Sequence, residues 1–518
     1  MANTHTETSI ELFNLIHTLS KGEKRYFKLY VRTRSAHLKG INYILLFDAV
    51  GKQKEYNEEK IKKLGIVKRG HLPMLKNYLY NLILESLRVL NSKGENIDNK
   101  LSNMLHNARI MRDKGLTEEE IKFLKKAKEL STKHERWGAL LDTLMMEMGT
   151  SKRRVDAISM QSTEEEMQQL LTKLSNMIEY LRLSSKTALQ VHKSTLQRNT
   201  KDKTLQKLFA HPLLKDANKA LTSEAKKTYY NTAFVYYIFI GDFKRAYSAI
   251  TQLRELIETN YTTLTFPALT YSFVLNRLAI IQHHLGKNEE LLSTIKKHRA
   301  LVNKPGPVST HAFAYSFINE TNHYLTLGEF EKGTTGIKNI EKELDKIKSE
   351  VPATALYSLY GNITLLYFGI ENYRQSLIWA NKIINLPKGM IREDIQAWTR
   401  ILHILIHYEL KTPDILEYLI VSTYRFLLRR KHLFKVEQGI LGFIRRLSKI
   451  DNSQKALLTE FSRFRVELIQ ITKDPEEKKA MLYFDLIAWL ESKIENKQFS
   501  EIIKKAREIK TGKRYESK

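Results

Sequence analysis

Apolar residues recur along most of the chain at intervals of three and four, the spacing that places them on one face of a helix. Before the turn at position 241, this spacing joins Tyr229, Ala233, Tyr236, Tyr237 and Ile240. After the turn at position 328, it joins Phe330, Thr334, Ile337, Ile340, Leu344 and Ile347. Alternating apolar and polar residues bounded by Asn-Gly or Asp-Gly turns, the signal of a strand hairpin, do not occur in the sequence. The pattern predicts an all-α protein.

Prolines stand mostly at or just before the start of these periodic runs, where the first helical N–H has no partner in any case. The stretches "TPDILEYL" and "KDPEEKKAMLYFDLIAWL" are the clearest helix starts. In them Thr412 or Asp474 is the expected N-cap, proline follows, and acidic residues in the first turn face the positive end of the helix dipole.

The turns between helices fall in register. Gly241-Asp-Phe, Gly286-Lys-Asn, Gly328-Glu-Phe and the glycine-free Glu371-Asn-Tyr are separated by 45, 42 and 43 residues. An amphipathic run flanks each turn on both sides. Self-similarity at such an interval predicts helical hairpins that stack on one another.

The segments "YIFIGDFKRA" and "YLTLGEFEKG" resemble the tetratricopeptide (TPR) family, in which an aromatic residue precedes Gly-acidic-aromatic and a small residue follows three positions later. "GIENYRQSLIWANKIINLP" is similar to the second helix of that motif, with Ser376 and Ala380 as its small packing residues. The resemblance covers residues 225–390 and continues more loosely to about 450. It departs from the family in its longer interval, which is about 34 residues in TPR proteins, and "LGKNEELL" lacks the aromatic residue.

This resemblance implies antiparallel helical hairpins stacked as a TPR-like α-solenoid. It also implies a packing role for one set of turn residues: Gly241, Phe243, Ala246, Gly286, Gly328, Phe330 and Tyr373. The expected organisation is an N-terminal helical module (1–95), a region of degenerate hairpins (96–222), the repeat array (223–450) and C-terminal capping helices (451–518).

Composition fits this organisation. The 518 residues include 42% apolar residues, only 21 glycines and 9 prolines, and no cysteine. A disulfide framework is therefore excluded, which suits a reducing compartment. "MANTHTETSIELFNLI" lacks the features of a secretory signal, and the apolar stretch "FVYYIFI" is far too short for a membrane span. We expect a cytoplasmic protein with no membrane span.

The net charge of +28 admits two interpretations that the sequence leaves open: a basic face for an anionic partner, or a solvated lysine-rich surface. Residues 56–90 outline a helix-turn-helix, in which Lys68, Arg69, His71 and Lys76 would contact phosphates. Against this, the second helix of the outline is apolar nearly all round, as in a buried bundle helix. A second basic stretch contains Arg429, Arg430 and Lys431.

Catalytic and metal-binding patterns are not evident. His403 and His407 share a helix face at i, i+4, but no acidic residue or third histidine accompanies them, so two packed histidines are the favoured interpretation. Neither a phosphate-binding glycine motif nor a G-x-S-x-G nucleophile motif occurs. We therefore expect no cofactor, no metal and no enzymatic activity.

Asn322 stands six residues before Gly328. In peptide-binding TPR proteins, an asparagine at that place faces the concave groove and binds the ligand backbone. The equivalent places in the other hairpins hold Val235, Ile280 and Leu365, so the resemblance does not carry a full peptide clamp.

The sequence thus predicts a non-enzymatic helical-repeat scaffold or adaptor that binds a protein or peptide partner. The alternative is a nucleic-acid-binding, transcriptional regulator whose repeats act as a sensor. The identity of the partner and the oligomeric state stay open.

Overall fold

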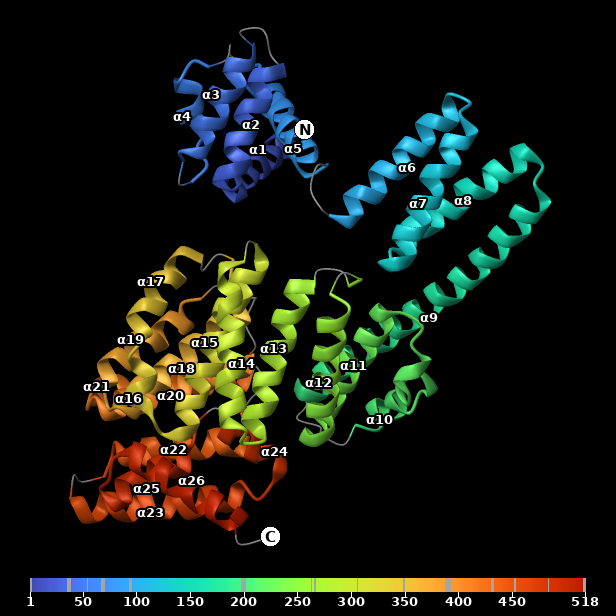
Figure 1. Cartoon of the computed structure of the whole chain (residues 1–518). Coiled ribbons are helices and arrows are strands. Elements are labelled where there is room, and N and C mark those ends of the chain that lie inside the picture. The colour runs from blue at the N-terminus through green and yellow to red at the C-terminus, as the bar shows by residue number, and fades with distance from the viewer. Residues whose placement is uncertain are drawn as a thin grey trace. The chain divides into compact units, whose positions relative to one another are not determined.

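The computed structural model in Figure 1 describes residues 2–515 except 35–38, 54, 67–69, 93–95, 197–201, 262, 265–266, 305, 348–349, 387–392, 430–432, 451–452 and 483. Every regular element among the described residues is a helix, which confirms the all-α prediction. The chain divides into two compact units, Met1–Leu174 and Ser175–Lys518. None of the described helices has the combined length and apolarity that a membrane crossing requires.

The first unit begins with α1 (Ala2–Thr18), α2 (Lys21–Arg34), α3 (Lys39–Gly51), α4 (Glu58–Lys63) and α5 (Leu72–Ser92). Leu12, Phe27, Leu46 and Leu79 are among the residues of their common core. It continues with α6 (Ile97–Asp113), α7 (Thr117–Lys133), α8 (Trp137–Arg154) and the first part of α9 (Ala157–Leu196), and a smaller core forms around Leu101 and Leu124.

The second unit contains the rest of α9, then α10 (Lys203–Phe209), η1 (Pro212–Leu214), η2 (Ala217–Lys219), α11 (Ser223–Phe239), α12 (Phe243–Thr259), α13 (Pro267–His284), α14 (Asn288–Ala300), η3 (Leu301–Asn303), α15 (Pro307–Leu327), α16 (Phe330–Thr334) and α17 (Ile337–Ile347). It ends with α18 (Ala353–Gly369), α19 (Tyr373–Ile384), α20 (Glu393–Glu409), α21 (Pro413–Arg429), α22 (Lys435–Leu447), α23 (Gln454–Ile471), α24 (Pro475–Lys478), η4 (Lys479–Leu482), α25 (Leu486–Glu495) and α26 (Phe499–Tyr515). Helices α21 and α24 begin at their predicted prolines.

Consecutive helices of this unit pack as pairs, α11 with α12, α13 with α14, α18 with α19 and α20 with α21. The first helices of neighbouring pairs also contact one another, because α15 packs against both α13 and α18. One apolar core runs from residue 313 in α15 to residue 502 in α26. The C-terminal helices are therefore part of the core that the hairpins build.

The turns between paired helices share one backbone geometry. The left-handed residue at each turn is Gly241 (φ +78°), Gly286 (+70°), Gly328 (+66°), Glu371 (+59°) or Lys411 (+54°). The next N–H closes back on the carbonyl five residues earlier, at 2.9 Å from Asp242 N to Tyr237 O and 3.0 Å from Glu329 N to Tyr324 O. This is the Schellman cap, which ends a helix and reverses the chain. The predicted turns are thus where the helices end, and Lys411 extends the series.

Asparagines spaced by 43 residues connect the first helices of successive pairs. The Asn319 side chain donates to Oδ1 of Asn276 at 2.9 Å. The Asn362 amide donates to the Ile318 carbonyl at 3.2 Å and to the Thr321 hydroxyl at 3.0 Å. These bonds fix the register between α13, α15 and α18. The identical spacing of the three asparagines is visible in the sequence, and the register could have been predicted from it.

Small residues lie where helices approach closely, as the resemblance implied. Ala246, Ser376 and Ala380 are fully buried. At Gly369 the position of a Cβ atom is only 2.4 Å from the Phe330 ring. Of the predicted aromatic residues, Phe330 is buried, Phe243 lies on the His284 ring at 4.6 Å between centroids, and Tyr373 packs edge-on against Phe368.

We expect Gly369→Ala to destabilise the protein by about 1–3 kcal/mol, because the added methyl group must displace the buried Phe330 ring. Gly361→Ala is the matched control, since a Cβ atom there meets nothing within 4 Å. That change should stabilise the same helix by about 0.5–1 kcal/mol through helix propensity. Urea unfolding monitored by circular dichroism measures both, and equal effects of the two changes would refute the packing role of Gly369.

Candidate functional site

A groove of about 550 Å³ runs along α15 and α18 in the second unit, and we call it the Asn322 groove. The C-terminal segment from η4 to α26 forms its other side. Its lining is mostly apolar or aromatic, with a few amide, hydroxyl and charged groups: Ile318, Asn322, Leu325, Thr326, Phe330, Tyr357, Ser358, Gly361, Asn362, Leu365, Ile395, Met481, Phe484, Asp485, Phe499, Ile503, Ala506 and Arg507. This size and composition are typical of ligand pockets.

Helical spacing brings the first wall together. Asn322, Leu325 and Thr326 share one face of α15, and Gly361 and Leu365 share one face of α18. The Asn322 side chain is exposed and has no hydrogen bond among the described residues. The predicted groove residue Asn322 therefore lines a groove, and its amide is free to bind. Leu365, its equivalent in the next hairpin, lines the same groove.

Aromatic stacking holds the second wall in place. The Phe499 ring on α26 lies parallel to Phe330, with 5.6 Å between the centroids, and it meets Phe484 at 5.5 Å. At Gly328 the position of a Cβ atom is 3.0 Å from the Ser500 carbonyl oxygen, so the turn touches the backbone of α26. Two features favour glycine at position 328: the positive φ and the close approach of the α26 backbone.

The other polar groups of the groove are mostly engaged within the unit. Asp485 caps α25 by accepting from Ala488 N at 3.0 Å, and Asn362 binds α15. Next to the groove, burial lowers the pKa of His283 to about 4, and His284, His323 and Arg507 lower it further. The Thr326 hydroxyl, which lines the groove, is 3.1 Å from His283 Nε2 and donates to the Asn322 carbonyl at 3.0 Å. The mostly apolar walls with a few polar groups are suited to binding a ligand.

A serine between two histidines lies elsewhere in this unit, on α13, α14 and α15. Ser272 Oγ is 2.8 Å from His298 Nε2 and 2.7 Å from His311 Nδ1. Such a pair could activate a nucleophile, but Ser272 is 0% exposed, His298 1% and His311 7%, so no substrate can reach the hydroxyl. Burial lowers the pKa of His298 to about 3 and that of His311 to about 4. We interpret this cluster as a neutral, structural hydrogen-bond network.

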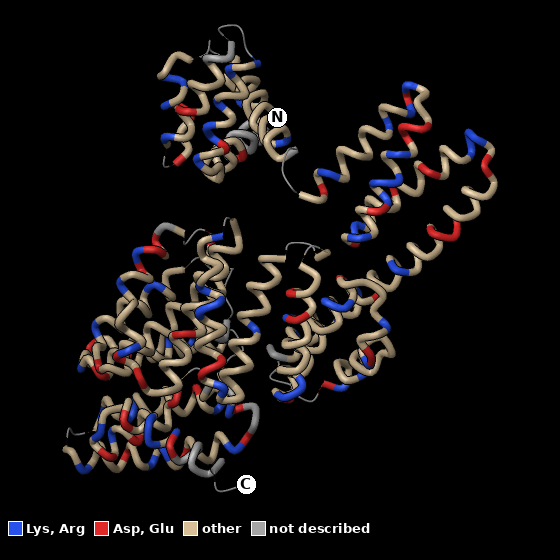
Figure 2. Tube along the Cα trace, viewed as in Figure 1, with Lys and Arg blue, Asp and Glu red and all other residues tan. Residues whose placement is uncertain are grey.

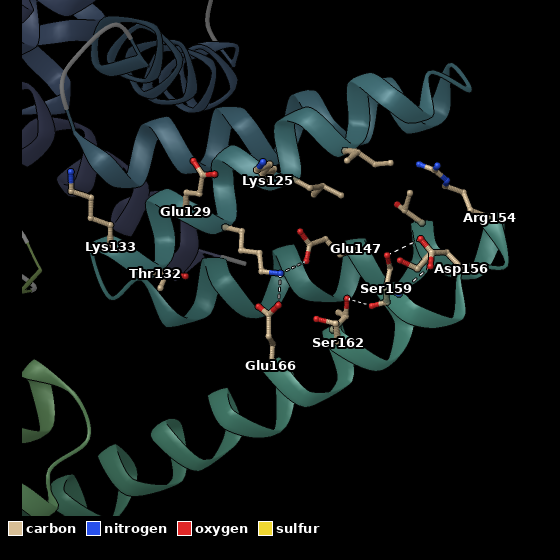
Figure 3. Close-up of a pocket in the computed structure, with 16 residues that line it drawn as sticks. Lys125, Glu129, Thr132, Lys133, Glu147, Arg154, Asp156, Ser159, Ser162 and Glu166 are labelled. Carbon is tan, nitrogen blue, oxygen red and sulfur yellow. Dashed lines mark hydrogen bonds and ion pairs between the residues drawn. The ribbon is translucent and has the colours of Figure 1, made fainter.

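A second hollow, of about 900 Å³, lies between α7, α8 and the start of α9 in the first unit (Figure 3). In its floor, Lys128 Nζ joins Glu147 at 3.0 Å and Glu166 at 2.7 Å. Burial raises the pKa of Glu147 although Lys128 opposes this effect. The Asp156 carboxylate accepts hydrogen bonds from the N–H and the hydroxyl of Ser159 at the start of α9. The ion pairs of Lys128 link α7 to α8 and α9, which indicates that they hold the three helices together.

Of the predicted phosphate contacts of the N-terminal stretch, the structure describes His71 and Lys76. Lys68 and Arg69 lie outside the described residues, and His71 is exposed. Lys76 contradicts the prediction: it is 2% exposed, and its ammonium is 2.6 Å from a Glu58 carboxylate oxygen. The ammonium also donates to the Tyr56 hydroxyl at 3.2 Å, so this charge is buried within the unit and is not available to a partner.

In the other predicted basic stretch, Arg429 is exposed at the end of α21, and Arg430 and Lys431 lie outside the described residues. His403 and His407 have ring centroids 4.7 Å apart, but they bind Asn381 and Thr412 respectively. Among the described residues, no group of three His, Cys, Asp or Glu side chains is arranged to hold a metal ion.

Comparison with known proteins gives no family assignment, because no family model, no curated protein and no solved structure matches the chain.

Proposed function

We propose that this protein is a non-enzymatic, TPR-like helical-repeat adaptor that binds a peptide segment of a protein partner in the Asn322 groove. The observation that carries the proposal is the free, exposed Asn322 amide between two apolar walls. An amide offers both a donor and an acceptor, so it can pair with the peptide backbone whatever the side chains. The apolar walls supply the area that affinity needs.

The recurrence of the turns supports the TPR-like part of the proposal. The same Schellman cap follows the first helix of each pair, and small residues lie at the close contacts between helices. The interval stays near 43 residues, so the helices are longer than those of TPR proteins. Longer first helices give each hairpin a wider face for a ligand.

The contacts that α26 makes as the second wall indicate which side chains the groove would bind. Phe499 and Ile503 of α26 lie against the turn at Gly328 and the Phe330 ring. A partner peptide with one aromatic or branched apolar side chain would make the same kind of contact in the part of the groove next to Gly361, where a Cβ atom meets nothing. The proposed setting is the cytoplasm.

The test fills the groove without disturbing the fold. Peptides selected from a random phage library against the full-length protein would be measured by fluorescence anisotropy with Gly361→Phe and Gly361→Ala. The phenyl group should occupy the groove and weaken binding at least about tenfold, which is about 1.4 kcal/mol, whereas alanine should leave it unchanged. Asn322→Ala should weaken binding by about three- to tenfold, the value of one hydrogen bond.

Asn339→Ala is the control for Asn322, since Asn339 is an exposed asparagine on α17 outside the groove. Circular dichroism would establish that all variants are folded. If selected peptides bind Gly361→Phe as tightly as the unmodified protein, or if no peptide is selected, the proposed groove function is wrong.

A further inference from the structure

Helix α2 of the first unit carries a row of basic side chains, which we call the α2 stripe: Lys21, Lys24, Arg25, Lys28 and Arg32. At 3.6 residues per turn, Lys21, Arg25, Lys28 and Arg32 fall within about 60° of one another around the helix. From Lys21 to Arg32 the stripe is roughly 16 Å long, at about 1.5 Å per residue. Lys and Arg, blue in Figure 2, occur in both units.

Most of this charge has no ion-pair partner among the residues that the structure describes. Lys28 pairs with Asp48 at 2.6 Å. Among the described residues, no carboxylate lies within ion-pairing distance of Lys21, Lys24, Arg25 or Arg32, and the side chains of Lys21, Arg25 and Arg32 are exposed. A solvated surface usually intersperses both signs of charge. In the described part of the chain, an ion pair therefore compensates Lys28 but not the other four residues of the stripe.

The acidic residue of α2 is already bound to the helix start. Glu23 accepts from Ser20 N at 2.7 Å, and the Ser20 hydroxyl accepts from Glu23 N at 3.2 Å. This reciprocal arrangement is a capping box. It keeps the Glu23 carboxylate at the N-terminal end of the helix, where it cannot reach Arg32.

A shallow hollow of about 760 Å³ adjoins the stripe. Arg25, Lys28 and Arg32 line it together with Tyr26, Leu29 and Leu90, and Ser20, Gly22 and Glu23 line it at the start of the helix. Leu29 is 57% exposed between the two arginines. The hollow therefore combines cations along one side with apolar and aromatic surface, the combination that contacts sugar and base next to a phosphate backbone.

We propose that the α2 stripe binds the phosphodiester backbone of a nucleic acid. Cations repeated at every helical turn match a polymer that carries a negative charge on every residue. An anionic membrane surface fits less well, because Leu29 is the large apolar residue that α2 exposes while Phe27 and Val31 are in the core. This site is independent of the Asn322 groove and of the basic residues near position 70.

The test measures binding of the full-length protein to a fluorescent duplex and to a fluorescent single strand between about 50 and 200 mM salt. For a duplex, the slope of log K against log salt is about −0.9 for each phosphate contact, and about −0.7 for a single strand. Arg25→Glu with Arg32→Glu should flatten the duplex slope by about 2 and weaken binding at least about tenfold at low salt. Arg25→Gln with Arg32→Gln should flatten the slope similarly without adding repulsion.

Lys122→Glu with Lys126→Glu is the matched control. Both lysines are exposed on α7 in the same unit, and the change in net charge is the same. The control should keep the slope and most of the affinity. The tighter of the two nucleic acids identifies the form that is bound.

Three results would overturn the proposal. The first is no binding of either nucleic acid at 50 mM salt. The second is an equal loss in the α7 control, which would assign the binding to diffuse charge. The third is binding to phosphatidylserine vesicles alone, lost in the Arg25 and Arg32 variant, which would make α2 a membrane-surface site instead.

Discussion

Lowering the pH from 7 to about 4.5 should destabilise the second unit by roughly 5 kcal/mol through His298 and His311 alone. Both rings are buried and neutral, and burial lowers the pKa of His298 to about 3 and that of His311 to about 4. In the unfolded chain a histidine has a pKa near 6.5. Between about pH 6.5 and 4 the unfolded state therefore binds protons that the folded state does not.

Because the unfolded state binds more protons, lowering the pH favours unfolding. The stabilisation is fully present above about pH 6.5, and it falls as the pH drops toward the folded pKa values, at about 1.36 kcal/mol per pH unit for each ring. Both rings are expected to stay neutral, because Ser272 is hydrogen-bonded to both and no carboxylate of the described residues lies beside either ring. A proton on either ring would bring an unpaired charge into the core.

Urea unfolding at several pH values would measure the effect, with fluorescence of Trp379, Trp398 and Trp489 reporting on the second unit in a Trp137→Phe background. His298→Gln with His311→Gln should lose some stability at pH 7 but show a flatter dependence below pH 6.5. His71→Gln is the control, because His71 is exposed in the first unit. An unchanged pH dependence in the double variant would contradict the role given to these two histidines.

Trp489→Ala should cost about 3–5 kcal/mol, the range expected for removal of a large buried aromatic side chain. The ring is 1% exposed and lies edge-on to Tyr408, Phe443 and Phe461, with centroids 5.7–6.4 Å away. Its Nε1–H donates to Glu409 at 2.7 Å, and Lys493 binds the same carboxylate. Trp489 thus attaches α25 to α20 by packing and by a hydrogen bond.

Trp489→Ala should also affect the Asn322 groove. Helix α25 precedes α26, which supplies Phe499 and Ile503 to the groove wall. Loss of the attachment at Trp489 should release this wall and abolish peptide binding, even where α15 and α18 stay folded. Trp489→Phe should cost only about 1–3 kcal/mol. An aromatic ring still packs at this place, but the Glu409 carboxylate loses the indole N–H donor.

Circular dichroism in urea is the appropriate measurement here, since the variant removes a fluorescent probe. Tyr418→Ala is the surface control; Tyr418 is 72% exposed, and its loss should change stability by less than about 0.5 kcal/mol. If Trp489→Ala unfolds within about 1 kcal/mol of the unmodified protein, the attachment of α25 through Trp489 is incorrect. If it is destabilised but still binds peptide, the C-terminal wall does not contribute to the groove.

The sequence alone determined the helices and the turns between them. Helical periodicity and left-handed caps depend on neighbours within a few residues, so Gly241, Gly286 and Gly328 could be located from the chain itself. The glycine-free turn at Glu371 can be predicted only from the interval of about 43 residues between turns. Lys411 was missed, because nothing in a lysine marks a positive φ.

The position of Asn322 on an accessible face could also be predicted, since it follows from spacing on a single helix. The groove itself could not be, because its second wall comes from α26, almost 180 residues later in the chain. Trp489 and Glu409 are likewise 80 residues apart. Which faces meet over such distances depends on the packing of the whole unit.

The basic residues differ most between what the sequence predicts and what the tertiary structure decides. The spacing of Arg25, Lys28 and Arg32 on α2 can be read from the sequence. The same is true of Lys68, Arg69 and Lys76. Only the tertiary structure decides that Lys76 is buried against Glu58 while Arg25 and Arg32 have no carboxylate partner among the described residues. A charge is available to a partner according to the groups that folding brings around it, and those groups come from other helices.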